Sequence, residues 1–132
     1  MEKISKKSIA LLMVMVLCIG CFTLTVSARW SYIATTYDCL ELKSGGKFHC
    51  DGQVSVFDGY KAKITVELQQ YNGGWNTIKT WSDYDWDFAV VCTDWYVAKG
   101  YQYRLKLTNQ ALSSSGSVLE THVDYSVSLI YN

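Results

Sequence analysis

The sequence contains no proline. Strand edges and turns therefore cannot be marked by the fixed φ and the missing N–H of that residue. Any protection of edge strands against pairing with another chain must come from charged side chains. The candidates for this role are Lys61, Lys63, Lys79, Lys106, Glu67 and Asp124.

The sequence also lacks an excess of charge of either sign, since Lys plus Arg and Asp plus Glu number 12 each. Without residues 1–28 the chain has nine basic and eleven acidic residues, a formal charge of −2. The basic residues are scattered singly, which excludes the footprint of a nucleic-acid-binding protein and a polybasic lipid-binding patch. We therefore expect no nucleic-acid partner.

No recognisable catalytic or metal-binding motif is present. The two histidines, His49 and His122, lie in different expected strands, and no serine or cysteine pattern surrounds them. Cys39, His49 and Cys50 lack the paired short spacings of a zinc site. Cys50 falls on the apolar face of its strand, which does not suit a thiolate nucleophile. We expect neither enzymatic activity nor a cofactor.

A secretory leader is present at the start of the chain. Three lysines precede an apolar run over residues 9–24, and Val26-Ser27-Ala28 supplies small residues before Arg29. This pattern predicts a signal peptide over residues 1–28 and a secreted protein over residues 29–132. The apolar run is too short for a confident membrane span, and we expect no stable span after cleavage.

A lipoprotein ending of the leader is the alternative. Gly20-Cys21 has the Gly-Cys step of such a processing site, and lipidation would anchor the protein at Cys21. The position three residues before that cysteine usually holds leucine and here holds Cys18.

Three cysteines remain after the leader, and an oxidising location favours one disulfide among them. Cys39 and Cys50 flank the turn segment 43–47, so a Cys39–Cys50 bond is the first choice. Strict alternation puts these two on different faces, a mismatch that a bulge at Gly45-Gly46 would repair. A Cys50–Cys92 bond is the second choice, and three reduced, mostly buried cysteines remain the alternative.

Beyond the leader the chain has no helical stripe, whereas alternation with a period of two recurs between breaks rich in Gly, Asn and Ser. In the clearest segment, 61–71, Ile64, Val66 and Leu68 share one face. The expected strands are 32–42, 47–57, 61–71, 75–81, 86–97, 101–107 and 118–131, with a loop over 109–117. This count predicts an all-β domain, a two-sheet antiparallel sandwich of immunoglobulin or fibronectin-III type with about seven strands.

A family resemblance runs along most of residues 29–132. The motifs that carry it are Gly46-Lys47-x-x-Cys50, Leu68-Gln69-x-Tyr71-x-Gly73-x-Trp75, Lys79-x-Trp81, Trp95-Tyr96-Val97-x-x-Gly100-Tyr101-x-Tyr103-Arg104-Leu105 and the Ser-Ser-x-Gly loop before Glu120-Thr121. In these the chain resembles a family of short exported β-sandwich proteins of Gram-positive anaerobes, a domain of unknown function. The resemblance implies a fold and an exported location, and no catalytic residues. Gly100-x-x-Tyr103 also resembles a tyrosine corner, whose phenol bonds backbone a few residues upstream.

Asp83, Asp85 and Asp87 alternate, and three carboxylates on one side of an extended segment suit calcium. The comparison with a calcium loop fails at its sixth place, which holds Phe88 in place of glycine. The main interpretation is a solvated strand edge, and the aspartates are a weak calcium candidate only.

Five aromatic residues lie in one expected hairpin and the loop after it: Tyr71, Trp75, Trp81, Tyr84 and Trp86. Exposed together, such rings form a platform on which sugar rings or peptide side chains stack. The competing interpretation is that Trp75 and Trp81 pack into or cap the core.

These observations predict a secreted, non-catalytic binding module for an extracellular glycan or surface protein, acting through the aromatic hairpin. The alternatives are a secreted bacteriocin-like or toxin effector and a structural component of an extracellular matrix.

Overall fold

The structure is a computed structural model that describes residues 30–132. The expected signal peptide and the lipidation site at Cys21 lie outside the described residues. Tyr32–Asn132 form one compact unit, which contains eight strands and no helix. Accordingly, the described part of the chain has no helix that is long and apolar enough to span a membrane.

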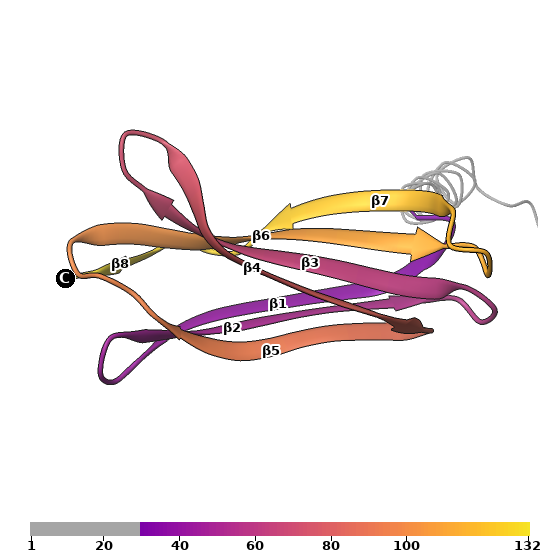
Figure 1. The fold of residues 1–132 in the computed structure, drawn as a ribbon, viewed down its shortest axis with the longest axis horizontal. Coiled ribbons are helices and arrows are strands. Elements are labelled where there is room, and N and C mark those ends of the chain that lie inside the picture. The colour runs from indigo at the N-terminus through magenta and orange to yellow at the C-terminus, as the bar shows by residue number, and fades with distance from the viewer. Residues whose placement is uncertain (1–29) are drawn as a thin grey trace, which may run out of the picture. The chain divides into compact units, whose positions relative to one another are not determined.

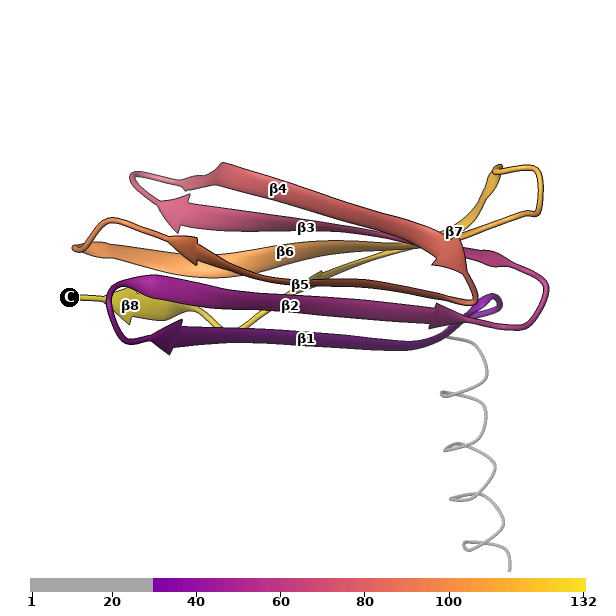
Figure 2. The ribbon, with the colours of Figure 1, turned by 60° about the horizontal axis from the view of Figure 1, so that its bottom comes forward.

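The strands form two antiparallel sheets that lie face to face (Figures 1 and 2). Sheet A has the order β1-β2-β5 and consists of β1 (Ile33–Lys43), β2 (Lys47–Val56) and β5 (Phe88–Tyr96). Sheet B has the order β4-β3-β6-β7, and β8 also pairs with β6. Its strands are β3 (Lys61–Tyr71), β4 (Trp75–Trp86), β6 (Tyr101–Leu112), β7 (Val118–Tyr125) and β8 (Leu129–Tyr131). The all-β, two-sheet antiparallel architecture expected from the alternation is confirmed.

The first three strands agree with the expected ranges to within one residue, whereas the later ones differ. β4 continues to Trp86, five residues beyond the expected end, because it stays paired with β3 along its length. β6 continues to Leu112, into the expected loop, because Ala111 and Leu112 are buried and pair with both β3 and β7.

The last expected strand is divided into β7 and β8 at Ser126. The Ser126 hydroxyl accepts a hydrogen bond from Leu105 N at 2.7 Å and donates one to Val127 O at 2.9 Å. Ser126 N also donates to Leu105 O at 3.0 Å. The Ser126 hydroxyl thus accepts from Leu105 N–H in place of a backbone carbonyl of the neighbouring strand. The regular pairing with β6 stops there.

The core lies between the facing surfaces of the two sheets. Its largest buried apolar side chains are Ile33, Phe48, Val54, Ile64, Val66, Leu68, Tyr103, Leu105 and Leu107. Both faces of β5 carry apolar residues in the sequence, and in the structure Ala89 and Val91 are on the inward face. The alternate residues Phe88 and Cys92 are exposed on the outer face, the face of sheet A that is turned away from sheet B.

The charged residues expected to protect edges are mostly on inner strands. Lys61, Lys63 and Glu67 lie on β3 and Lys106 on β6, both of which have neighbours on each side. Of the expected set, only Lys79 on β4 and Asp124 on β7 lie on edge strands. The sequence showed where charges alternate, but it did not show which strands end a sheet.

The chain passes from sheet B to sheet A through a single residue, Asp87. Asp87 has φ of 63°, in the left-handed region that Asp tolerates better than most residues. Its N–H donates to Tyr60 O at 3.2 Å, and its carbonyl accepts from Val56 N at 2.8 Å. Both backbone groups of the crossing residue are therefore paired.

Tyr103 is the largest fully buried side chain. Its hydroxyl donates to Ala98 O at 2.6 Å and accepts from Gln70 Nε2 at 3.1 Å. The ring packs against Phe48 of the opposite sheet, with centroids 5.1 Å apart. The backbone hydrogen bond expected from the Gly100-x-x-Tyr103 motif is confirmed.

Replacing Tyr103 with Phe is expected to lower the free energy of unfolding by about 1–3 kcal/mol, because Ala98 O and Gln70 Nε2 both lose their partner. Urea denaturation followed by tryptophan fluorescence measures this. Tyr101→Phe is the matched control, since the Tyr101 hydroxyl has no hydrogen bond with any of residues 30–132. Equal stabilities of the two variants would contradict the role of the Tyr103 hydroxyl.

Gly52 lies in β2 on the face toward sheet B. A Cβ at this position would lie 2.7 Å from Leu107, 2.9 Å from Val66 and 3.0 Å from Ile64. The two sheets therefore approach each other closely over Gly52, and only glycine fits.

Gly52→Ala is expected to cost about 1–3 kcal/mol of stability, because the methyl group overpacks a closed core. Thermal unfolding measures the difference. Gly74→Ala is the control, because a Cβ on Gly74 meets no atom within 4 Å and its φ is not positive. A melting temperature of Gly52→Ala at or above that of the wild type would show that the core is looser than the structure describes.

Candidate functional site

The five expected platform residues lie in three separate places. Tyr71 and Trp75 flank the β3–β4 turn on the outer face of sheet B, with ring centroids 5.3 Å apart. The Arg104 guanidinium lies 4.2 Å from the ring of Trp75 and 4.2 Å from the ring of Tyr125. Its Nε donates to Gln69 Oε1 at 2.9 Å. Trp75, Arg104 and Tyr125 thus form a stack across three strands, which we call the arginine stack.

Trp81 faces the other side of β4, since it pairs with the inward residue Val66. Its ring lies edge-on to Trp95 of β5, with centroids 6.0 Å apart. Lys79 Nζ lies 4.5 Å from the centroid of Trp95. Trp81 therefore covers the open side between β4 and β5, which agrees with the core-capping interpretation.

Tyr84 and Trp86 lie near the other end of β4, on the outer face of sheet B. They pair with Lys63 and Lys61, and their side chains are 47% and 50% exposed. Lys61 Nζ lies 5.3 Å from the Tyr84 centroid and 4.8 Å from the Trp86 centroid. We call Lys61, Tyr84 and Trp86 the Lys61 cluster.

The alternating aspartates have structural partners. Asp83 Oδ2 accepts from Val90 N at 2.9 Å, which links β4 to β5, and Asp85 Oδ1 accepts from Trp86 N at 2.7 Å. Asp87 is the crossing residue. Within residues 30–132 these three side chains do not form a group of converging metal ligands. The structure therefore gives the calcium candidate no support.

Neither expected disulfide is formed, and all three described cysteines are free. Cys50 points into the core, whereas Cys39 and Cys92 both pair with Asp51 and share its outward face. Each expected pair, Cys39–Cys50 or Cys50–Cys92, therefore has one thiol on either side of sheet A. The Gly45-Gly46 turn does not bring the two thiols onto one face, because β1 and β2 pair without a bulge from the Thr35–Ser55 pair to the Lys43–Lys47 pair.

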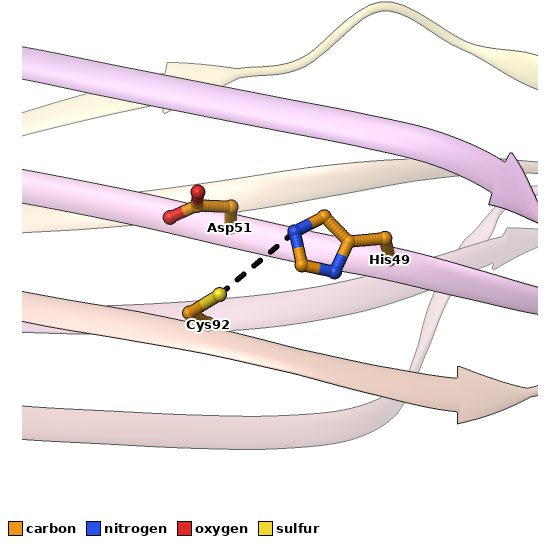
Figure 3. A group of neighbouring side chains, drawn as sticks. All are labelled: His49, Asp51 and Cys92. Carbon is orange, nitrogen blue, oxygen red and sulfur yellow. Dashed lines mark hydrogen bonds between the residues drawn. The ribbon is translucent and has the colours of Figure 1, made fainter.

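A polar cluster on the outer face of sheet A is the arrangement that sequence reasoning missed. His49 and Asp51 of β2 and Cys92 of β5 place one ligand atom each within 4.8 Å of one another (Figure 3). His49 Nε2 lies 3.8 Å from Cys92 Sγ, and His49 Nδ1 lies 2.8 Å from Asp94 Oδ1. We call His49, Asp51 and Cys92 the sheet A triad.

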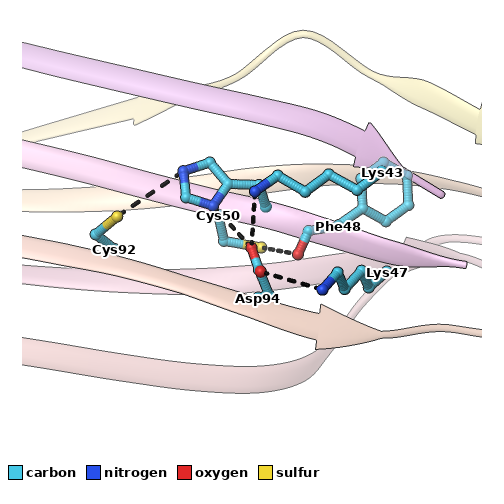
Figure 4. A network of polar contacts seen from close by, with 7 residues as sticks. Lys43, Lys47, Phe48, Cys50, Cys92 and Asp94 are labelled. Carbon is cyan, nitrogen blue, oxygen red and sulfur yellow. Dashed lines mark hydrogen bonds and ion pairs between the residues drawn. The ribbon is translucent and has the colours of Figure 1, made fainter. Parts of the chain in front are cut away.

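The hydrogen-bonding roles in this cluster follow from the charges. Lys43 Nζ and Lys47 Nζ lie 3.7 and 3.6 Å from the two oxygens of Asp94 (Figure 4). The pKa of Asp94 is lowered, chiefly by the hydrogen bond from His49, with the two lysines adding to the effect. An ionised carboxylate only accepts, so His49 donates from Nδ1. The other ring nitrogen, Nε2, is then free of hydrogen in the neutral imidazole.

The signal for this cluster was present in the sequence as His49-x-Asp51 and Cys92-x-Asp94. Alternation puts each pair on one face of its strand. The missing information was that β2 and β5 are neighbours in which Asp51 lies opposite Cys92 and His49 opposite Asp94.

Comparisons with known proteins leave the site to be interpreted from its own chemistry. No protein-family model matches the chain, and neither a curated protein nor a solved structure is significantly similar to it.

The thiols are expected to differ sharply in reactivity. Burial, with repulsion from Asp94 as a smaller cause, raises the pKa of Cys50 to about 12, so this side chain stays a protonated thiol at pH 8. In the presence of a chelator, iodoacetamide should modify exposed Cys92 and spare Cys50 until denaturant is added. Peptide mass spectrometry identifies the modified residue.

Cys92→Ser is the control for this labelling, and it should remove the rapid modification that we assign to Cys92. Modification of Cys50 in the native protein at the rate of Cys92 would contradict the described burial.

Proposed function

We propose that the protein is an exported, non-catalytic binding module with a fibronectin-type sandwich. Its ligand is an extracellular glycan or a surface protein, of which we favour a glycan. The contact surface is the outer face of sheet B, where the Lys61 cluster and the exposed parts of the arginine stack lie.

The strand order supports the fibronectin-type assignment. In an immunoglobulin constant domain the fourth strand belongs to the sheet of the first two. Here β4 pairs with β3 and leaves β1, β2 and β5 as a three-stranded sheet. The buried Tyr103, bonded to Ala98 O just before β6, is the tyrosine corner typical of such sandwiches.

The Lys61 cluster is the observation that carries the proposed function. Tyr84 and Trp86 are two residues apart on one face, and about half of each side chain is exposed. Lys61 lies close to both rings, which restricts their rotation before any ligand arrives. Flat exposed rings offer apolar faces to sugar rings, and the ammonium group supplies donors for hydroxyl or carboxylate oxygens.

The surface between the two aromatic areas suits an extended ligand. Thr65 pairs with Ser82 on one side and Thr108 on the other, so small hydroxyl side chains cross the outer face there. Lys61 and Tyr71 are ten residue steps apart along β3, which corresponds to about 33 Å. An oligosaccharide or wall polymer of that length would contact Trp86 at one end and Tyr71 at the other.

Trp86→Ala is expected to weaken binding at least about tenfold, equivalent to about 1.4 kcal/mol, with little change in melting temperature. The exposed ring contributes to ligand contact and little to the core. The measurement is a glycan and envelope-fraction binding screen on protein that starts at Arg29, followed by titration of the retained ligand.

Trp81→Ala is the matched control, since Trp81 covers the side of the core. We expect it to lower the free energy of unfolding by about 2 kcal/mol or more. The proposed function fails if no glycan or wall fraction is retained, or if Trp86→Ala binds as tightly as the wild type.

A further inference from the structure

We propose that the sheet A triad binds one divalent transition-metal ion of the zinc class. The ligands are His49 Nε2, an Asp51 carboxylate oxygen and Cys92 Sγ, and the fourth position is open to water or an external ligand. Asp94 is a positioning residue for His49. This site lies on sheet A and is separate from the proposed glycan surface on sheet B.

The distances fit a tetrahedral ion after small side-chain movements. With Zn–S of about 2.3 Å and Zn–N or Zn–O of about 2.0–2.1 Å, ligand atoms in a tetrahedron lie about 3.3–3.6 Å apart. His49 Nε2 and Cys92 Sγ are already 3.8 Å apart, and all three ligand atoms lie within 4.8 Å of one another. The pair that is furthest apart, at no more than 4.8 Å, must close by about 1 Å to reach this spacing.

The backbone places the three ligands on one face of sheet A. His49 and Asp51 are two residues apart on β2, so they share a face. Cys92 of β5 lies directly opposite Asp51, and neighbouring strands are about 4.8 Å apart. The sheet itself therefore sets the spacing of the ligands, as Figure 3 shows.

A second observation, at Asp51 Oδ1, also favours a cation at this place. This oxygen is buried and has no hydrogen-bond partner among the described residues. A buried carboxylate oxygen is costly unless a donor or a cation faces it. The nearby lysines do not meet this need, because Lys43 and Lys47 pair with Asp94. A metal ion bound between Asp51, His49 and Cys92 would satisfy it.

Asp94 prepares His49 for the metal. Histidine ligands usually donate their second ring N–H to a carboxylate or carbonyl, which fixes the tautomer. Asp94 Oδ1 accepts a hydrogen bond from His49 Nδ1 at 2.8 Å, and His49 Nε2 is directed at Cys92. Lys43 and Lys47 form ion pairs with the two oxygens of Asp94, as Figure 4 shows. These pairs favour a role for Asp94 in orienting His49 over a role as a metal ligand.

The donor set selects the class of metal. A thiolate, an imidazole and a carboxylate suit zinc and related transition metals, whereas calcium and magnesium require oxygen ligands. Binding replaces the S–H bond of Cys92 with a metal–sulfur bond, and the proton leaves to solvent. Zinc keeps its oxidation state, so no electron donor or acceptor is required.

Cys92, His49 and Asp94 also have the order of a thiol nucleophile, an imidazole base and an orienting carboxylate. That interpretation gives Asp51 no role and leaves its buried oxygen unpartnered. We therefore favour the metal site, and the experiment separates the two interpretations.

The experiment uses chelator-treated protein that starts at Arg29. It is titrated with Zn²⁺ by calorimetry and with Co²⁺ by absorption spectroscopy. We expect one ion per chain, a thiolate-to-cobalt charge-transfer band and about one proton released per ion. Cys92→Ser should abolish the band, and His49→Ala should weaken binding at least tenfold. Asp94→Asn should weaken it about 10–100-fold, as outer-shell changes do.

Cys39→Ser and His122→Ala are the matched controls, because each removes a metal-ligand side chain outside the triad. Both should bind zinc like the wild type. In the wild-type protein Zn²⁺ should also slow the alkylation of Cys92, a readout that does not depend on the folding of any variant.

The proposal is overturned if zinc does not bind at one ion per chain, or if Cys92→Ser and His49→Ala bind like the wild type. It is also overturned if Cys39→Ser loses binding as fully as Cys92→Ser. Rapid alkylation of Cys92 that Zn²⁺ leaves unchanged would favour the nucleophile interpretation.

Discussion

The antiparallel register of β2 is the constraint on which most of this structure depends. β2 is the middle strand of sheet A, and its residues alternate between the core and the outer face. Phe48, Cys50 and Val54 are fully buried, whereas His49 and Asp51 between them face outward. A slip of one residue would bury the imidazole and the carboxylate and expose the apolar set. The core and the sheet A triad are therefore specified by the same pairing.

Gly52 and Tyr103 hold that register from opposite sides of the core. Gly52 lets the side chains of Ile64, Val66 and Leu107 approach β2 closely, and a shifted register would bring a larger residue to this place. The Tyr103 ring packs against Phe48, and its hydroxyl is bound to the segment before β6. Packing between the sheets and hydrogen bonding within sheet B thus support the same alignment.

The sequence predicted the strands well where apolar and polar residues alternate strictly, as in β2 and β3. It was ambiguous for β5 because both faces of that strand carry apolar side chains, and only the packing against β2 and β3 decides between them. The single aromatic platform was expected because five rings are close in the sequence. β4 separates them, since Trp81 alternates to the inner face and Trp75 and Tyr84 lie nine residues apart on an extended strand.

The cysteines show why a site made of neighbouring strands is hard to find in a sequence. His49 and Cys50 are adjacent in the chain but point to opposite sides of sheet A, whereas His49 and Cys92 are 43 residues apart and meet. Cys50 is a core residue whose pKa is raised by burial, and Cys92 is an exposed thiol beside an imidazole. Identical side chains thus acquire different chemistry from the face that the register gives them.

The proposed metal site also bears on how a chain without proline keeps its edges unpaired. β5 is an edge strand of sheet A, and it is held to β2 on one side only. On its free side, the Val90 N–H is already covered by Asp83 from β4. An ion bound by His49, Asp51 and Cys92 would link β5 to β2 on the outer face and oppose local opening of that edge. Because a ligand that binds only the folded state stabilises it, the edge would become more stable as the site fills.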